Sequence, residues 1–190
     1  MHYSDGDIME ALRRGAEDKL ACDNWIRVTE FERSQLQPAS LDLRLGTEFV
    51  CLTATASVDM RDRLVPSHPV CIGSGRDSYY ELKPHTLVLA TTIERIEIGP
   101  RIWAKIEGKS SLGRMGLVVH VTAGFVDPGF RGQVTLELYN IGPSPIRLRP
   151  WLPVCQVAFG ECMTRAKRPY GSPGLGSRYQ DQVGAVPVRS

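Results

Sequence analysis

The residues that could carry out chemistry are concentrated in one stretch of the chain, from Lys109 to Tyr139. This stretch contains a serine pair, an arginine, an aspartate and a glutamate, separated by strand-like apolar runs. Polar groups in such a setting either form a solvated fringe on a β-sheet or converge on a bound substrate. Their types and spacing indicate which elements would have to bring them together.

The segment KSSLGRMG has the composition of one or two helical turns that begin at a serine. Ser110 or Ser111 is expected at the N-cap, where free backbone amides make an anion site. Ser110 and Arg114 are four residues apart, so on a helix they share one face. Together with Lys109 they could surround a phosphate chain. The alternative is a capped turn with solvated cations.

The segment AGFVDPGFRG predicts a tight β-turn, because Asp-Pro-Gly is a strong turn triplet. Phe125 and Phe130 flank this turn. An aromatic ring beside free backbone groups can stack on a base or a sugar while amides and carbonyls read the polar edge. The alternative is a hairpin corner with a buried phenylalanine.

Glu137 lies in the strand-like segment VTLELYN, on the face that it shares with Thr135 and Tyr139 by period-two alternation. If this face is solvated, the glutamate needs no further explanation. If the face is instead a contact between subunits, Glu137 loses its water and becomes suited to general acid/base catalysis.

The elements that must position these groups are mostly β-strands. Gly, Pro, Asn and Ser clusters separate several short apolar segments, which favours a mostly-β barrel or sandwich. Alternation or a continuous apolar run predicts strands at residues 41–45, 86–98, 134–139, 146–149 and 154–159.

A short helix is predicted at the N-terminus, from Ser4 to Gly15. Ser4 can cap the free amides, and Asp5 and Asp7 suit the positive end of the helix dipole. Gly15 is expected to end the helix. No other long amphipathic helix is predicted.

The composition is that of one globular domain spanning residues 1–190. Hydrophobic residues make up 42% and charged residues 23% of the chain, and its length allows a sizeable core. The net charge of +2 is too small to suggest nucleic-acid binding. No apolar run approaches the ~20 residues that span a bilayer, and MHYSDGDIMEALRRG lacks the pattern of a secretory signal. We therefore expect a cytoplasmic protein without membrane or nucleic-acid partners.

Several familiar catalytic and metal-binding patterns do not occur. The five cysteines are scattered and contain no C-x-x-C, which predicts buried, reduced thiols rather than disulfides or structural zinc. Zinc deaminases require H-x-E and P-C-x-x-C, and neither pattern is in the sequence. The G-x-S-x-G of serine hydrolases and the P-loop pattern are also missing.

The composition changes near Arg165. Residues 165–190 are rich in Gly, Pro, Ser and basic residues and have almost no apolar periodicity, which predicts a mobile segment. The alternative is a functional lid. The side chains that could fold over a ligand are Tyr170, Arg178, Tyr179 and Gln182.

As an ordered pattern, KSSLGRMGLVVHVTAGFVDPGFRGQVTLELYN closely resembles the signature of the dCTP deaminases, the metal-free deaminase branch of the dUTPase-like superfamily. QLQPASLDLRLG is similar to the N-terminal strand motif of that family, and RPYGSPGLGSRYQDQVGAVPVRS to its nucleotide-covering tail. The resemblance implies a mainly-β fold, a distorted dUTPase-like barrel with a short N-terminal helix and a mobile C-terminal lid. It also implies a homotrimer with sites between subunits, and hydrolytic deamination of dCTP at cytosine C4.

The resemblance implies catalytic roles position by position. Ser110 and the backbone carbonyl of Ala123 would hold the attacking water. Glu137 would be the general base, taking a proton from that water and delivering protons to the cytosine ring and the leaving ammonia. Arg114 would fix the geometry beside Ser110 and Glu137.

The resemblance also implies how the nucleotide is bound. Asp127 and the backbone from Val121 onward would bind sugar and base, and Phe130 could reject a 2′-hydroxyl sterically. Mg2+ would be bound through the triphosphate, with no direct protein ligand and no zinc, and would neutralise phosphate charge rather than activate water. The residues expected to contact the triphosphate are Lys109, Ser111, Tyr170, Arg178 and Gln182.

Two positions depart from a simple deaminase pattern. Arg178 stands where a lysine is common in the family, which changes the donor geometry. Gly124 and Phe125 follow the alanine as in members that form dUMP, whereas members that stop at dUTP tend to carry His-Arg there. The sequence therefore favours conversion of dCTP to dUMP, ammonia and diphosphate in one site.

Several alternatives stay open. The protein could release dUTP, deaminate another cytosine nucleotide, or be a non-catalytic nucleotide-binding module. A dUTPase that has lost deamination is disfavoured because Ser110, Arg114 and Glu137 occur together. The resemblance further implies dTTP as a feedback inhibitor, with His120 and residues 110–125 as the region to inspect.

Overall fold

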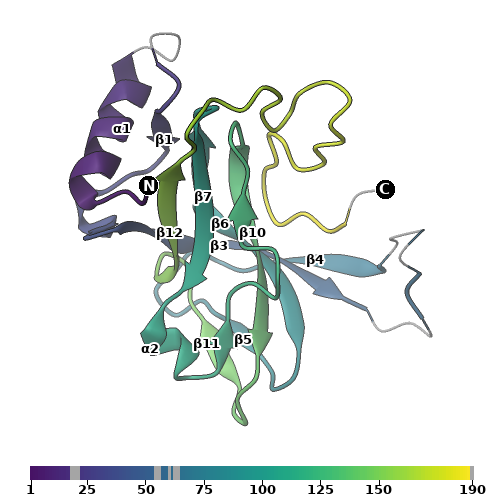
Figure 1. Cartoon of the computed structure of the whole chain (residues 1–190). Coiled ribbons are helices and arrows are strands. Elements are labelled where there is room, and N and C mark those ends of the chain that lie inside the picture. Colours follow the sequence, from purple (N-terminus) through teal and green to yellow (C-terminus); the bar gives the residue numbers. More distant parts are fainter. Residues whose placement is uncertain (18–21, 54–56, 60, 62–64, 189–190) are drawn as a thin grey trace.

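The computed structural model describes residues 1–17, 22–53, 57–59, 61 and 65–188. A curled antiparallel sheet forms its body, and helix α1 (Asp5–Glu17) lies at one side of it (Figure 1). The other helical elements are a 3-10 turn, η1 (Arg33–Gln35), and the single-turn helix α2 (Ser110–Gly113). No helix in the described ranges is long and apolar enough to cross a membrane.

The named strands of the sheet pair antiparallel, in the order β8-β10-β6-β3-β12-β7-β9. Strand β1 adds to β6, strands β2 and β4 add to β3, and β5 pairs with β11 in a separate ribbon. The prediction of a mainly-β fold with a distorted barrel and a short N-terminal helix is confirmed, and the curled sheet forms a half-barrel. The strands are β1 (Ile26–Val28), β2 (Leu36–Gln37), β3 (Ser40–Leu52), β4 (Ser67–Cys71), β5 (Tyr80–Leu82), β6 (Leu87–Ile98), β7 (Ile102–Gly108), β8 (Leu117–Val118), β9 (Phe125–Val126), β10 (Arg131–Asn140), β11 (Ile146–Leu148) and β12 (Pro153–Glu161).

All five strands predicted from the sequence are present, as parts of β3, β6, β10, β11 and β12. Strand β10 shows why alternation worked: Val134, Leu136 and Leu138 are buried, while Thr135 and Glu137 on the other face are half-buried. A strand packed on one face against the core requires apolar residues at every second position. The prediction that Glu137 lies opposite the aliphatic face is therefore confirmed.

Strand β7 was not predicted, although its sequence IWAKIEG alternates. Ile102, Ala104 and Ile106 are buried, and the residues between them are more exposed. The strand pairs with β12 along its whole length. The alternation covers only a few residues between Pro100 and Gly108, which makes the signal of this strand weak.

Helix α1 begins as predicted but ends later. The Ser4 hydroxyl accepts the Asp7 N–H at 3.3 Å, and the Asp7 carboxylate accepts the Ser4 N–H at 2.9 Å. The helix continues through Gly15 to Glu17, so the prediction that Gly15 ends it is wrong. A Cβ at Gly15 would lie 2.0 Å from the Ile26 carbonyl oxygen, so the glycine serves the close approach of α1 to β1.

The cysteine prediction holds in part. All five cysteines are free thiols. Only Cys155 is buried, Cys71 is exposed, and Cys22, Cys51 and Cys162 are half-buried. Burial raises the pKa of the Cys155 thiol, so this group stays protonated and behaves as a small apolar side chain.

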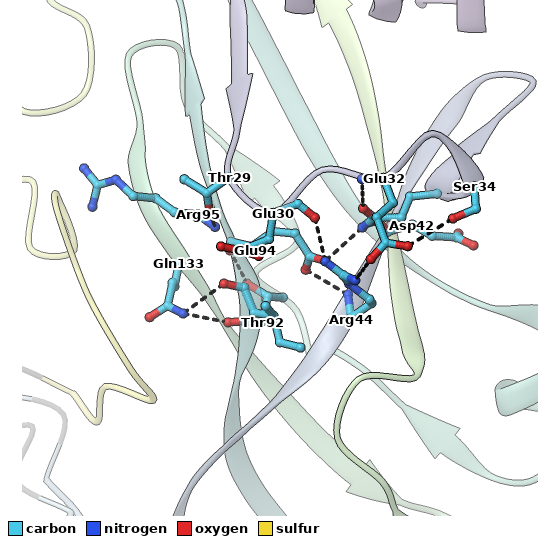
Figure 2. Close-up of polar contacts among 12 residues, drawn as sticks. Thr29, Glu30, Glu32, Ser34, Asp42, Arg44, Thr92, Glu94, Arg95 and Gln133 are labelled. Carbon is cyan, nitrogen blue, oxygen red and sulfur yellow. Dashed lines mark hydrogen bonds and ion pairs between the residues drawn. The ribbon is translucent and has the colours of Figure 1, made fainter. Parts of the chain in front are cut away.

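The centre of the sheet contains a buried ion pair between Arg44 on β3 and Glu94 on β6 (Figure 2). Glu94 has 0% exposed side chain and Arg44 has 11%. Glu94 accepts the Arg44 Nε–H at 2.7 Å, the Arg44 backbone N–H at 2.9 Å and the Gln35 amide at 2.8 Å. Since both carboxylate oxygens are bonded, the desolvated charge is fully compensated.

Arg44 also reaches out of the sheet to the loop before η1. It donates to the Glu30 carbonyl at 2.6 Å and to the Glu32 carboxylate. The same site is where the pairing of β3 with β6 shifts register, between Leu45 and Phe49. The ion pair therefore joins the two central strands and one loop at the point where the regular ladder is interrupted.

We predict that Glu94→Gln lowers the free energy of unfolding by about 3–5 kcal/mol, because Arg44 loses its buried counter-charge and keeps only the exposed Glu32 carboxylate. Urea unfolding followed by circular dichroism measures this loss. Glu10→Gln is the matched control, since Glu10 pairs with Arg13 and Arg14 on the exposed face of α1, where solvent screens the charges and the loss should be far smaller. Equal losses in the two variants would contradict the role given to Glu94.

Candidate functional site

A cavity of about 270 Å³ opens between β9, β10 and the C-terminal tail. It brings together six of the residues predicted to form the site, from segments far apart in the chain. Those six residues are Ala123, Asp127, Phe130, Glu137, Tyr170 and Gln182.

Glu137 is the acidic group of this cavity best placed to act on a bound molecule. It lies in the middle of β10, opposite Leu89 of β6, and is half-buried. Its Oε2 accepts the backbone N–H of Val121 at 2.8 Å, while Oε1 has no partner among the described residues. One carboxylate oxygen is therefore held in place and the other is available.

Val121 was predicted to offer its backbone to the nucleotide. In this structure its N–H donates to Glu137, and Val121 is exposed and does not line the cavity. The hydrogen bond ties the loop between β8 and β9 to the middle of β10. Asp127, at the end of the same segment, is exposed at the cavity wall.

The Asp-Pro-Gly turn forms as predicted. The Phe130 N–H donates to the Asp127 carbonyl at 3.1 Å, and Gly129 has φ +91°. A positive φ at the third turn position is what glycine permits without strain. Phe130 is buried and also lines the cavity, where its ring lies 5.8 Å from that of Tyr170. The alternative of a turn with a buried phenylalanine is confirmed, and stacking of this ring on a base or sugar stays a prediction.

Gly124 and Phe125 differ in their surroundings. A Cβ at Gly124 would lie 2.9 Å from the Ile106 carbonyl and 3.0 Å from the His120 ring, so this position has no room for a side chain. Phe125 is exposed and stacks on Trp103 with ring centroids 6.1 Å apart. The His120 Nδ1 is buried and has no hydrogen-bond partner among the described residues.

Helix α2 starts one residue earlier than predicted. Lys109, not Ser110 or Ser111, is the N-cap, and it makes no side-chain cap bond because an ammonium group has no acceptor. Ser110, Ser111 and Arg114 are exposed and do not line the cavity of their own chain. Figure 1 shows α2 at the opposite end of the sheet from the tail. The structure thus separates these residues from Glu137.

Lys109 has a partner that the sequence did not suggest. Its Nζ donates to Oδ2 of Asp42, in the middle of SLDLRLG, at 2.6 Å. Asp42 is buried, and its Oδ1 has no hydrogen-bond partner among the described residues. The pair ties the start of α2 to β3 and uses the ammonium group that was predicted to meet a triphosphate.

The described part of the tail, up to residue 188, lies against the body of its own chain. The Tyr170 N–H donates to the Pro128 carbonyl at 2.7 Å, and the Tyr170 hydroxyl accepts the Tyr179 N–H at 3.0 Å. Gln182 is buried and donates to the Gln133 carbonyl at 2.6 Å. Arg178 is exposed and lies outside the cavity lining. The tail therefore adopts the covering position expected of a lid.

The apolar walls of the cavity were not predicted from sequence. Ile106 comes from the unpredicted strand β7, Leu89 from β6, and Val186 and Val188 from the end of the tail. Only the alternation of IWAKIEG could have indicated Ile106. In the part of the chain that the structure describes, no group of three or more His, Cys, Asp or Glu side chains gathers to hold a metal ion.

Fold and site together define a mainly-β half-barrel protein whose cavity is lined in part by its own C-terminal segment. The chain belongs to the dCTP deaminase-like family, whose model matches residues 12–162.

Its relatives agree with this assignment. A dCTP deaminase of Halorubrum lacusprofundi is 41% identical over 192 residues, which cover 97% of this chain and 88% of that protein. A dUMP-forming dCTP deaminase of Tropheryma whipplei is 41% identical over 186 residues, with 97% and 90% covered. The crystal structure of the Agrobacterium tumefaciens 2′-deoxycytidine 5′-triphosphate deaminase superimposes with a TM-score of 0.63 at 22% identity, over 85% of this chain and 48% of that one. That last likeness concerns the fold.

Proposed function

We propose that the protein is a hydrolase that deaminates dCTP at cytosine C4, with Glu137 as the general base. The observation that carries this proposal is the state of the Glu137 carboxylate. It lies half-buried at the cavity wall, with Oε2 held by the Val121 N–H and Oε1 without a partner among the described residues. Family membership and the names of the relatives support cytosine deoxynucleotide as the substrate.

The proposed step needs a base because water at neutral pH is a weak nucleophile. Glu137 accepts a proton from the water as its oxygen bonds to C4, which makes C4 tetrahedral. Glu137 delivers that proton to ring N3, which receives the electron pair of the N3–C4 double bond. It then takes the proton of the new C4 hydroxyl and passes it to the amino group, so the C4–N bond breaks and ammonia leaves as the C4 carbonyl of uracil forms. General acid/base catalysis of this kind is worth about 10²–10⁴-fold, and placement of the water adds to it.

The surroundings of Glu137 suit this chemistry. The carbonyl of Ala123 lies in the segment that lines the cavity and is proposed to orient the water with Ser110. Phe130 and Asp127 on the same wall are proposed to contact the sugar, and Tyr170 and Gln182 to cover the nucleotide. Mg2+ is proposed to arrive with the triphosphate and to neutralise its charge.

We further propose that the complete site lies between subunits of a homotrimer. Ser110, Ser111 and Arg114 are exposed and are not in the cavity of their own chain, so a neighbouring subunit would have to supply them. Exposed apolar side chains on the intervening segment support this arrangement, because a subunit contact would remove them from water. They are Met115, Val121 and Phe125.

The reaction is proposed to continue to dUMP and diphosphate in the same site. The support is Gly124 and Phe125 in the sequence, together with a relative named as dUMP-forming. The tight enclosure of Gly124 by Ile106 and His120 shows that the glycine is structurally required here. We also propose dTTP as a feedback inhibitor, bound near His120, whose buried Nδ1 has no partner among the described residues.

We predict that Glu137→Gln lowers ammonia release from dCTP by about 10²-fold or more, because the amide cannot take a proton from water. Ammonia is followed with the pure protein, dCTP and Mg2+. Glu81→Gln is the matched control, since Glu81 is exposed on the small β5–β11 ribbon. Unchanged ammonia release in Glu137→Gln would refute the assignment. Tight dCTP binding by the wild type with no turnover would favour a non-catalytic module.

Ion-exchange chromatography of the same reaction is expected to show dUMP and diphosphate with no accumulation of dUTP. Formation of both products in one site leaves no stage at which free dUTP builds up. If dUTP accumulates instead, the protein is a deaminase only, and the significance given to Gly124 and Phe125 is wrong.

The shared site predicts complementation between two inactive variants. Ser110→Ala and Glu137→Gln should each be inactive alone. Trimers refolded from an equal mixture should regain part of the wild-type activity, because some sites then pair an intact Ser110 with an intact Glu137 from different subunits. The two proteins mixed without refolding are the control. No recovery in refolded mixtures of confirmed trimers would contradict a site shared between subunits.

A further inference from the structure

The tail is bonded to the body of the protein along the first residues of β10. The Asp181 N–H donates to the Arg131 carbonyl at 2.8 Å, and the Gln133 N–H donates to the Gln182 carbonyl at 3.1 Å. Gly132 and Gln182 form a parallel bridge. Residues 181–182 thus act as a short additional strand at the edge of the sheet.

The side chain of Asp181 makes the strongest of these contacts. One carboxylate oxygen accepts from the Arg95 guanidinium at 2.6 Å and the other from the Arg131 guanidinium at 2.8 Å. Arg95 comes from β6 and Arg131 from β10, so the tail is joined to both strands. We call these three residues the Asp181 clasp.

The backbone of Asp181 has an uncommon conformation. Its φ is +58°, in the left-handed region that few residues other than glycine, asparagine and aspartate adopt. Such a conformation persists where the surroundings determine it, and here two charged contacts do so. Those contacts, with Arg95 first and Arg131 next, hold the pKa of the Asp181 carboxyl below its usual range. The nearby Glu97 also pairs with Arg95, at the longer distance of 3.4 Å.

The residues next to Asp181 in the chain connect the clasp to the cavity. Tyr179 and Gln182 both line the cavity that contains Glu137, and Asp181 lies between them in the chain. Gln182 is buried with its Oε1 unpartnered among the described residues. The position of Asp181 therefore bears directly on two of the tail side chains that form the cavity wall.

We propose that Asp181 is a positioning residue, which holds Tyr179 and Gln182 in the nucleotide-binding position by pairing with Arg95 and Arg131. The effect on catalysis rests on the proposed deaminase function. A tail that is already docked does not have to be ordered by the nucleotide, so binding retains more of its free energy. If the tail is docked only part of the time, the apparent affinity falls by that fraction.

The test uses Asp181→Asn in the full-length protein. Asparagine and aspartate both adopt the left-handed conformation more often than other non-glycine residues, so this change removes the charge while keeping a residue that suits the backbone. We expect amide hydrogen exchange in residues 181–186 to become about threefold to tenfold faster without nucleotide, as suits the loss of two partly exposed ion pairs. The KM for dCTP should rise by a similar factor, while kcat stays within about twofold.

Asp59→Asn is the matched control, because Asp59 makes the same kind of ion pair with its neighbour Arg61 alone. It should change neither tail exchange nor KM. Unchanged tail exchange in Asp181→Asn would overturn the clasp, and faster exchange with an unchanged KM would overturn its positioning role. Since the exchange measurement needs no nucleotide, it tests the clasp even if dCTP proves not to be a substrate.

A second variant tests whether the effect of Asp181→Asn comes from the loss of its ion pairs. Arg131→Gln should also speed tail exchange, but less, because Arg95 still holds the carboxylate. In a protein with both Asp181→Asn and Arg131→Gln, the increase in tail exchange should be clearly less than the sum of the two single effects, since residues that share one contact are coupled. Full additivity would overturn the proposal.

Discussion

The rest of the structure depends on neutralising one buried carboxylate. Glu94 is removed from water on the central strand β6, and an uncompensated charge there would be prohibitively costly. Arg44 on β3 supplies the counter-charge, and its backbone N–H and the Gln35 amide supply the remaining donors. Other long strands of the sheet pair with these two: β10 pairs with β6, and β12 pairs with β3. Because β10 is built on β6, the position of Glu137 follows from this central pairing.

A second set of contacts distributes the candidate site over the molecule. Glu137 lines a cavity that the tail also lines, and the tail is joined to the sheet by the Asp181 clasp. Helix α2, with Ser110 and Arg114, is tied instead to β3 by the ion pair of Lys109 with Asp42. One chain thus holds the two groups of residues that are proposed to form the site apart from each other. If neighbouring copies bring these groups together, one kind of chain supplies all the residues of the site. Each group can then be inactivated separately by substitution.

Local patterns predicted the parts of the fold that depend on local forces. Alternation revealed β10 because one of its faces packs on the core, and Asp-Pro-Gly revealed the turn at Asp127 because its geometry is set within four residues. The prediction for Gly15 was wrong because this glycine serves a contact with another element and not the end of its own helix. A glycine in the last turn of a helix suggests a stop, but here it admits the Ile26 carbonyl from β1. Lys109 was predicted to contact a phosphate. Its actual partner, the buried Asp42, lies far away in the chain, so no local pattern indicates the ion pair.

The sequence by itself determined the mainly-β class, the capped N-terminal helix, the family, and the face of β10 on which Glu137 lies. Each of these follows from residues close together or from an ordered pattern along the chain. Only the tertiary structure decided which of those residues share a cavity, that Val121 holds Glu137, and that Asp181 meets Arg95 and Arg131. Such contacts join residues whose separation carries no periodic signal. They arise when apolar faces are buried and every charge removed from water finds a partner.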